Sequence, residues 1–312
     1  MTRLITTLSL LAAAAFSFSC SETNALPADG KPQVFVSVPP YLGLVEAIGG
    51  DLIEARSLVT ADKDPHTYSP TPQDVVALSK SHLYFTAEMP FEEPLLSKLG
   101  RKGPKVYSLT ENMELLEGNC DHGDHSDDEH GHDHEDHDHG HHHHHDHDHH
   151  HHEMDPHVWL SPELLAQQAE QIAGILKNTL AEEHTETIET NLKAFTQRLS
   201  ETDQALKAQM EPLKGHHFYV YHGAFAYFAQ HYGMQQMAIE VNGRRPEPKE
   251  LAALIKQAKE EQVKLIFVQP QFDQSGAKTV AEAIGGKVIP VDPLEQDVIA
   301  NLKKIADALT SK

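Results

Sequence analysis

Short apolar runs alternate with longer amphipathic stretches in both halves of the chain. Gln33–Val38 is rich in β-branched residues and closed by two prolines, which predicts a strand, and the apolar spacing of Tyr41–Ile48 predicts a helix. Strands that alternate with helices favour a parallel sheet covered on both faces. By the same criteria we expect strands at 82–86, 105–109, 217–221, 236–241, 263–268 and 287–291, and helices at 72–79, 224–232, 248–261, 275–284 and from Leu294 onward.

The segment between these two alternating regions has a different pattern. Ser161-Pro162-Glu163 is a strong helix start, because serine caps a helix and proline fits its first turn. From there to about Met210 no proline interrupts the periodicity, which predicts two consecutive long helices with a break near 181–184. The sequence therefore predicts an α/β protein of two lobes, each with a mainly parallel sheet flanked by helices, joined by a long rigid backbone helix.

The N-terminus has the features of an export signal. A basic start precedes the apolar run Leu4–Phe18, which predicts a signal peptide over 1–26 and a periplasmic protein. Cys20 follows the run as a lipid-modified cysteine would, but residues 17–19 lack the usual aliphatic residue, so cleavage near Ala25 without a lipid anchor stays an alternative. We expect an N-terminal lobe at 27–160, linking helices at 161–212 and a C-terminal lobe at 213–312.

A histidine-rich run interrupts the first lobe. Residues 121–152 contain seventeen histidines and eleven acidic residues without Lys or Arg. This composition buries too little apolar surface to fold, so we expect a disordered loop. Neutral imidazole binds Zn, Cu and Ni, but overlapping sites without fixed geometry should be weak and poorly selective. We expect the run to collect or sense metal; a solvated loop that responds to pH is the alternative.

Charge and cysteine usage narrow the classes of partner. The net charge is −22, and half of it lies in the histidine-rich run. A surface this acidic argues against a nucleic-acid partner, because phosphate binding needs clustered Lys and Arg. Cys20 and Cys120 are the only cysteines, so processing or lipidation of Cys20 leaves no internal disulfide.

Three of the eight histidines outside the run follow predicted strands or lie in loops. His66 lies in Asp-Pro-His-Thr-Tyr-Ser-Pro, His157 in Asp-Pro-His-Val-Trp-Leu-Ser-Pro, and His222 in Tyr-His-Gly. The repeated Asp-Pro-His stiffens the backbone beside the imidazole, so little entropy is lost when a metal binds. Asp292 follows the last predicted strand and could supply an oxygen ligand, with a helix cap or turn residue as the alternative.

These motifs, with Tyr-His-Gly-Ala-Phe-Ala-Tyr-Phe and Glu247-Pro-Lys-Glu-Leu, resemble the metal-binding solute-binding proteins of ABC transporters, specifically the zinc-uptake (ZnuA-like) branch. The resemblance runs from about Gln33 to the end. It implies that His66 and His157 from the first lobe and His222 and Asp292 from the second bind metal between the lobes. In the manganese-binding relatives glutamate takes the position of His222, whereas three neutral imidazoles suit tetrahedral zinc. In some zinc relatives water replaces the aspartate, so the resemblance leaves open whether Asp292 or water is the fourth ligand.

The resemblance also implies a function. We expect a monomeric receptor that captures Zn²⁺ outside the inner membrane and delivers it to a membrane ABC permease with small lobe motions. The alternatives are a zinc-buffering or storage protein acting through the histidine-rich run, a manganese receptor, and a zinc hydrolase, since three histidines and a water also form a catalytic shell. The chain has no His-Glu-x-x-His motif, and we expect no enzymatic activity.

Overall fold

The computed structural model describes residues 30–100, 103–118, 154–240, 244–272 and 274–311. The predicted signal peptide, Cys20, Cys120 and the histidine-rich run lie outside the described residues. None of the helices in the described part of the chain is both long and apolar enough to span a membrane.

The N-terminal lobe is built on a four-stranded parallel sheet with the order β2-β1-β3-β4. Its two central strands, β1 and β3, consist almost entirely of buried residues, as expected for a parallel sheet covered on both faces. The elements of this lobe are β1 (Gln33–Val36), α1 (Pro39–Gly49), β2 (Glu54–Ser57), α2 (Pro72–Ser79), β3 (Leu83–Thr86), α3 (Glu92–Leu99) and β4 (Lys105–Ser108).

The C-terminal lobe repeats this strand order in a second parallel sheet, β6-β5-β7-β8. Because all four strands run the same way, their carboxyl ends meet at one edge, where ligand sites of α/β proteins lie. The elements are β5 (His217–Val220), α6 (Ala226–His231), β6 (Gln235–Ala238), α7 (Pro248–Glu260), β7 (Leu265–Val268), α8 (Ser275–Ile284), β8 (Lys287–Pro290) and α9 (Val298–Thr310).

Two helices connect the lobes. α4 (Pro162–Thr179) begins at Ser161, whose hydroxyl accepts a hydrogen bond from the Leu164 N–H, and α5 (Thr185–Met210) follows after a short turn. At 1.5 Å per residue, the 26 residues of α5 span about 39 Å. α5 contacts α1, α4 and α9. Its buried side chains form one stripe: Ile188, Phe195, Leu199, Leu206 and Met210.

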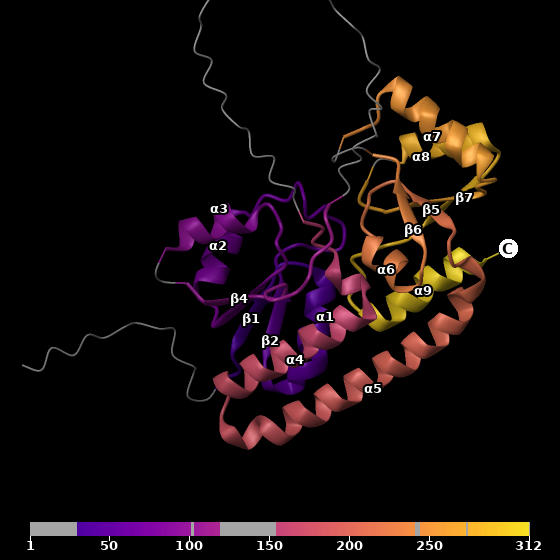
Figure 1. The fold of residues 1–312 in the computed structure, drawn as a ribbon. Coiled ribbons are helices and arrows are strands. Elements are labelled where there is room, and N and C mark those ends of the chain that lie inside the picture. The colour runs from indigo at the N-terminus through magenta and orange to yellow at the C-terminus, as the bar shows by residue number, and fades with distance from the viewer. Residues whose placement is uncertain (1–29, 101–102, 119–153, 241–243, 273, 312) are drawn as a thin grey trace, which may run out of the picture.

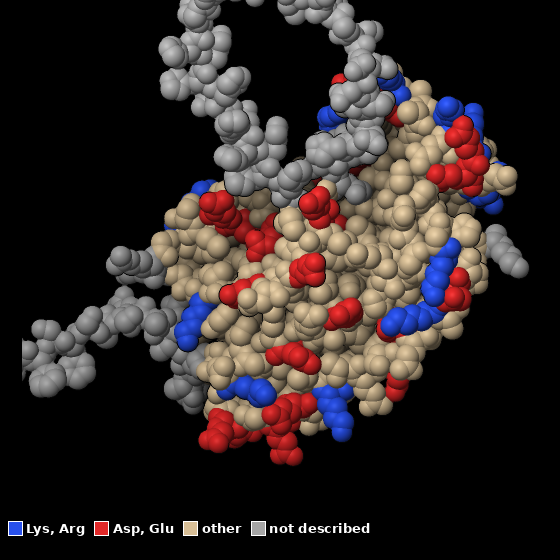
Figure 2. Space-filling model, in the orientation of Figure 1, with Lys and Arg blue, Asp and Glu red and all other residues tan. Residues whose placement is uncertain are grey.

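Figure 1 shows α5 running along both lobes, and Figure 2 shows side chains of both charges spread over this side of the molecule. A continuous cluster of buried apolar residues extends through both lobes and includes Val36, Trp159 and Phe225. A second, smaller cluster lies on the other face of the C-terminal sheet, around Tyr219 and Ile266. Wide separation of the lobes would expose the shared cluster to water, which favours small motions.

The structure confirms the predicted fold class of two parallel-sheet lobes joined by a long helix. Two elements were not predicted: β2 is a partly exposed edge strand without an apolar run, and α3 carries only short apolar stretches. The predicted strand 236–241 ends at Ala238. The last helix starts at Val298, because the Asp297 side chain caps it by accepting the Ala300 N–H. The exact domain boundaries stay a prediction.

Candidate metal centre

Three histidines from distant parts of the sequence meet between the lobes. One ring nitrogen from each of His66, His157 and His222 lies within 4.8 Å of the other two. The ring centroids are 4.9 to 5.3 Å apart. The loop after β2 carries His66, the turn before α4 carries His157, and His222 follows β5.

Asp155 orients the ring of His157. One carboxylate oxygen, Oδ1, accepts from the His157 Nδ1 at 2.7 Å and from the His157 backbone N–H at 2.8 Å. Because a carboxylate only accepts, Nδ1 carries the proton and Nε2 presents its lone pair to the other histidines. Trp159 packs edge-on against the same ring, with centroids 5.3 Å apart. His157 is 5% exposed, so its ring is fixed by both a hydrogen bond and packing.

His66 repeats part of this arrangement. The Asp64 Oδ1 accepts from the His66 backbone N–H at 2.9 Å, as Asp155 does for His157. Burial, and then the proximity of His157 and His222, lowers the pKa of His66 to about 2. His66 is therefore neutral near pH 7, and neutral imidazole is the form that binds metal.

His222 has a buried carboxylate partner of its own. Its Nδ1 is hydrogen-bonded to Glu240, whose side chain is 8% exposed. The other ring nitrogen, Nε2, is buried and has no hydrogen-bond partner among the described residues. A buried polar atom without a partner is costly, and a bound cation would remove that cost.

The nitrogen geometry fits zinc. Zn–N bonds of 2.0–2.1 Å in a tetrahedral shell place two ligand nitrogens about 3.4 Å apart. The Nε2 atoms of His66 and His157 are 3.3 Å apart. Two neutral imidazole lone pairs at this distance repel each other unless a proton or a metal ion lies between them, so the donor set is arranged for a cation.

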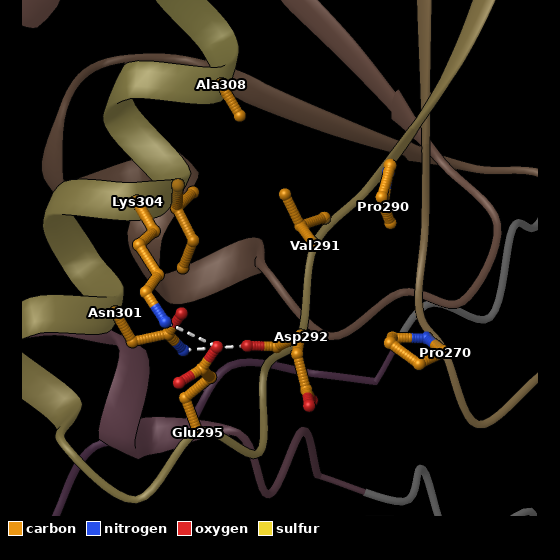
Figure 3. Close-up of a pocket in the computed structure, with 9 residues that line it drawn as sticks. Pro270, Pro290, Val291, Asp292, Glu295, Asn301, Lys304 and Ala308 are labelled. Atoms are coloured by element: carbon orange, nitrogen blue, oxygen red, sulfur yellow. Dashed lines mark hydrogen bonds and ion pairs between the residues drawn. The ribbon is translucent and has the colours of Figure 1, made fainter.

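Asp292 lies outside the group of three nitrogens that approach one another within 4.8 Å. Its Oδ1 accepts from the Leu294 N–H at 2.8 Å and from Gln271 Nε2 at 3.0 Å, and burial raises its pKa. Asp292 lines a cavity of about 270 Å³. Figure 3 shows its carboxyl directed away from the ion pair of Lys304 and Glu295. Asp292 thus occupies a turn position, and its role as the fourth ligand stays a prediction.

Comparison with known proteins identifies the family. The family profile described as "Zinc-uptake complex component A periplasmic", ZnuA, matches residues 34–311. The chain belongs to the ZnuA family. A crystal structure of ZnuA superposes with a TM-score of 0.76 at 33% identity, covering 90% of this chain and 98% of that one. A ZnuA deletion mutant with zinc bound gives the same TM-score and identity, with 90% and 97% covered.

The first curated relatives are longer than this chain. The zinc-binding lipoprotein AdcA of Streptococcus pneumoniae R6 is 31% identical over 288 residues, which are 90% of this chain and 53% of AdcA. The chain therefore spans about half the length of the first curated relatives it matches. A putative metal-binding protein of Chlamydia muridarum is 26% identical and matches over 94% of this chain and 96% of its own length.

The sequence reasoning missed Glu240 as a partner of His222. It placed Glu240 inside a strand predicted to extend to Val241, whereas β6 ends at Ala238 and Glu240 lies two residues beyond it. His222 lies two residues after β5 in the same way. If the ends of both strands had been predicted correctly, His222 and Glu240 would have been expected at the same edge of the sheet.

Proposed function

We propose that this protein is the zinc receptor of an ABC uptake system. It binds Zn²⁺ between its lobes through His66, His157 and His222, with Asp292 or water completing the shell, and delivers the ion to a membrane permease. The observation that carries the proposal is the convergence of three imidazole nitrogens from both lobes in a member of the ZnuA family.

The donor set favours zinc over manganese. Imidazole is a ligand of borderline metals, whereas Mn²⁺ prefers carboxylate and water. The two carboxylates nearest the rings, Asp155 and Glu240, are hydrogen-bonded to histidine Nδ1 atoms and are not members of the donor group. These hydrogen bonds also argue against the hydrolase alternative, because a hydrolase needs a free general base beside the metal.

The cellular setting is also part of the proposal. The apolar N-terminal run supports export to the periplasm, with a lipid anchor at Cys20 as an option. We propose that the receptor acts as a monomer, because one chain supplies all three histidines. The histidine-rich run would gather zinc near the site, and the buffering alternative would make that run the main zinc store.

Competition titration with a chromophoric chelator tests the proposal. We would titrate zinc and manganese into the full chain and into a variant without residues 121–152, each with and without His157→Ala. The deletion is feasible because Glu117 and Met154 pair as an antiparallel bridge and the Asp155 N–H donates to the Leu116 carbonyl at 2.8 Å. His216→Ala, at an exposed histidine, is the control.

We expect one tight zinc site that survives the deletion and weakens by at least about 100-fold in His157→Ala, more than loss of an outer partner costs. Manganese should bind more weakly, and His216→Ala should behave as wild type. Tight binding that persists in the deleted His157→Ala chain would contradict the proposal. Loss of all tight binding on deletion would instead favour the buffering protein.

A further inference from the structure

His222 and the two residues that hydrogen-bond to it follow three neighbouring strands. In the order β6-β5-β7, His222 lies two residues after β5, Glu240 two residues after β6, and Gln269 directly after β7. All three are therefore at the carboxyl edge of the C-terminal sheet. The strands on both sides of β5 each send one polar side chain to His222.

Gln269 binds both backbone polar groups of His222. Its Oε1 accepts from the His222 N–H at 3.1 Å, and its Nε2 donates to the His222 carbonyl at 2.6 Å. Gln269 is fully buried. The side-chain amide thus continues the pairing of β5 with β7 past the end of the strands, and it fixes the backbone from which the imidazole projects.

The ring of His222 is held on two further sides. Glu240 accepts from Nδ1, and Phe272 stacks on the ring face with centroids 4.5 Å apart and planes inclined by 18°. With the backbone, Nδ1 and one ring face engaged, the buried Nε2 is the ring nitrogen left for a ligand. One ring nitrogen of His222 lies within 4.8 Å of those of His66 and His157. Such preorganisation reduces the entropy lost on binding.

Two carboxylates near the histidines can balance the charge of a bound dication. Three neutral imidazoles bring no charge to a dication, and burying an uncompensated charge is costly. Asp155 and Glu240 are 5% and 8% exposed, and each lies directly behind one imidazole. Their two negative charges match Zn²⁺ without touching it, and a carboxylate behind an imidazole raises the basicity of the ligand nitrogen.

We propose that Glu240 and Gln269 are positioning residues that set the zinc affinity of the C-terminal half of the site, Glu240 through its charge and Gln269 by clamping the His222 backbone. This inference rests on the proposed zinc receptor function. It assigns the tightness of the site to side chains that do not touch the metal.

The test uses the full chain and two variants. Glu240→Gln keeps the size and an acceptor for Nδ1 but removes the charge, and Gln269→Met removes both backbone hydrogen bonds at similar length. The matched control is Glu261→Gln, because Glu261 forms a similar carboxylate pair with His217 Nδ1, at 2.9 Å, beside the start of β5. Zinc affinity is measured by chelator competition and the geometry of the site by Co²⁺ absorption, with circular dichroism to verify folding.

We expect Glu240→Gln and Gln269→Met each to weaken zinc binding by about 10- to 100-fold and to change the Co²⁺ d–d bands, while Glu261→Gln leaves both unchanged. Wild-type affinity and an unchanged Co²⁺ spectrum in Glu240→Gln would overturn the inference, and that variant decides the outcome if Gln269→Met does not fold. An equal loss in Glu261→Gln would also overturn it. Failure of the zinc proposal looks different, since the wild type itself would then have no tight site sensitive to His157→Ala.

Discussion

The two lobes hold their histidines in different ways. His66 and His157 each follow an aspartate by two residues, and that aspartate accepts the histidine backbone N–H. His222 is held by residues 18 and 47 positions further along the chain. The N-terminal histidines therefore depend on short local turns, whereas His222 is in place only once three strands have paired.

The contrast extends to the carboxyl edges of the two sheets. In the C-terminal lobe the buried carboxylate at this edge, Glu240, is bonded to a histidine. In the N-terminal lobe the corresponding edge carries Glu92, which is 5% exposed and accepts the Ala87 N–H at 2.8 Å. With the same strand order, the buried carboxylate therefore holds a histidine ring in one lobe and a backbone N–H in the other.

Among the side chains of the N-terminal lobe that hold a histidine, the largest effect should come from replacing the aspartates of the two local turns. Asp155 binds both the ring and the backbone of His157, whereas the Asp64 contact is to the backbone of His66. Asp155→Asn removes the charge that fixes the Nδ1 proton, so zinc affinity should fall by about 10- to 100-fold. Asp64→Asn keeps an acceptor for the backbone N–H and should weaken zinc by less. Chelator competition measures both.

Equal losses in the two variants would show that the turns, and not the ring contact, determine affinity. Thermal unfolding of the metal-free proteins is the control for a general loss of stability, which should be small for Asp64→Asn because the Asp64 contact to Thr67 is exposed.

The local and distant contacts also explain what the sequence could predict. Proline, aspartate and histidine in one short motif mark His66 and His157 without knowledge of the fold, and the alternation of strands and helices predicted both sheets. Glu240 and Gln269 were not found, because their partner is far along the chain and their place depends on where β6 and β7 end. The edge strand β2 was missed because its residues lack the apolar pattern of a buried strand.

The buried carboxyl of the N-terminal lobe should make stability depend on pH. Burial raises the pKa of Glu92 to about 7, although hydrogen bonds from Ser37 and the backbone lower it in part. In the unfolded chain a glutamate titrates near pH 4.3. The folded state therefore binds an extra proton between these values, and the stabilisation present at low pH is lost as pH rises through about 7. Glu92→Gln has no proton to release and should not show this loss.

Between pH 5 and pH 8, wild type should lose about 1–3 kcal/mol of unfolding free energy relative to Glu92→Gln. Urea unfolding at the two pH values, with chelator present, measures the shift. Glu93→Gln, at the exposed neighbouring glutamate, is the control and should give a constant difference. If the free-energy difference between Glu92→Gln and wild type were also the same at both pH values, the Glu92 carboxyl of the wild type would already be ionised at pH 5.

The smallest effect on zinc should come from the contact that ties α6 to the turn of His157. The Tyr227 hydroxyl accepts the Leu116 N–H at 2.9 Å and donates to the Asp155 carbonyl at 2.8 Å, and the residue is 4% exposed. Tyr227→Phe leaves two backbone groups without partners and should cost about 1–3 kcal/mol, or about 2–4 °C in Tm for each kcal/mol.

Zinc affinity should nevertheless fall by less than about 3-fold in Tyr227→Phe, because Asp155 retains its bonds to the His157 ring and backbone N–H. This is less than the loss expected when a residue that hydrogen-bonds to a metal ligand is itself replaced. Calorimetry of the metal-free protein and chelator competition separate the two effects. A loss of zinc affinity as large as that of Asp155→Asn would break the comparison between the lobes. The turn that carries His157 would then depend on the opposite lobe for its geometry, as His222 depends on its sheet.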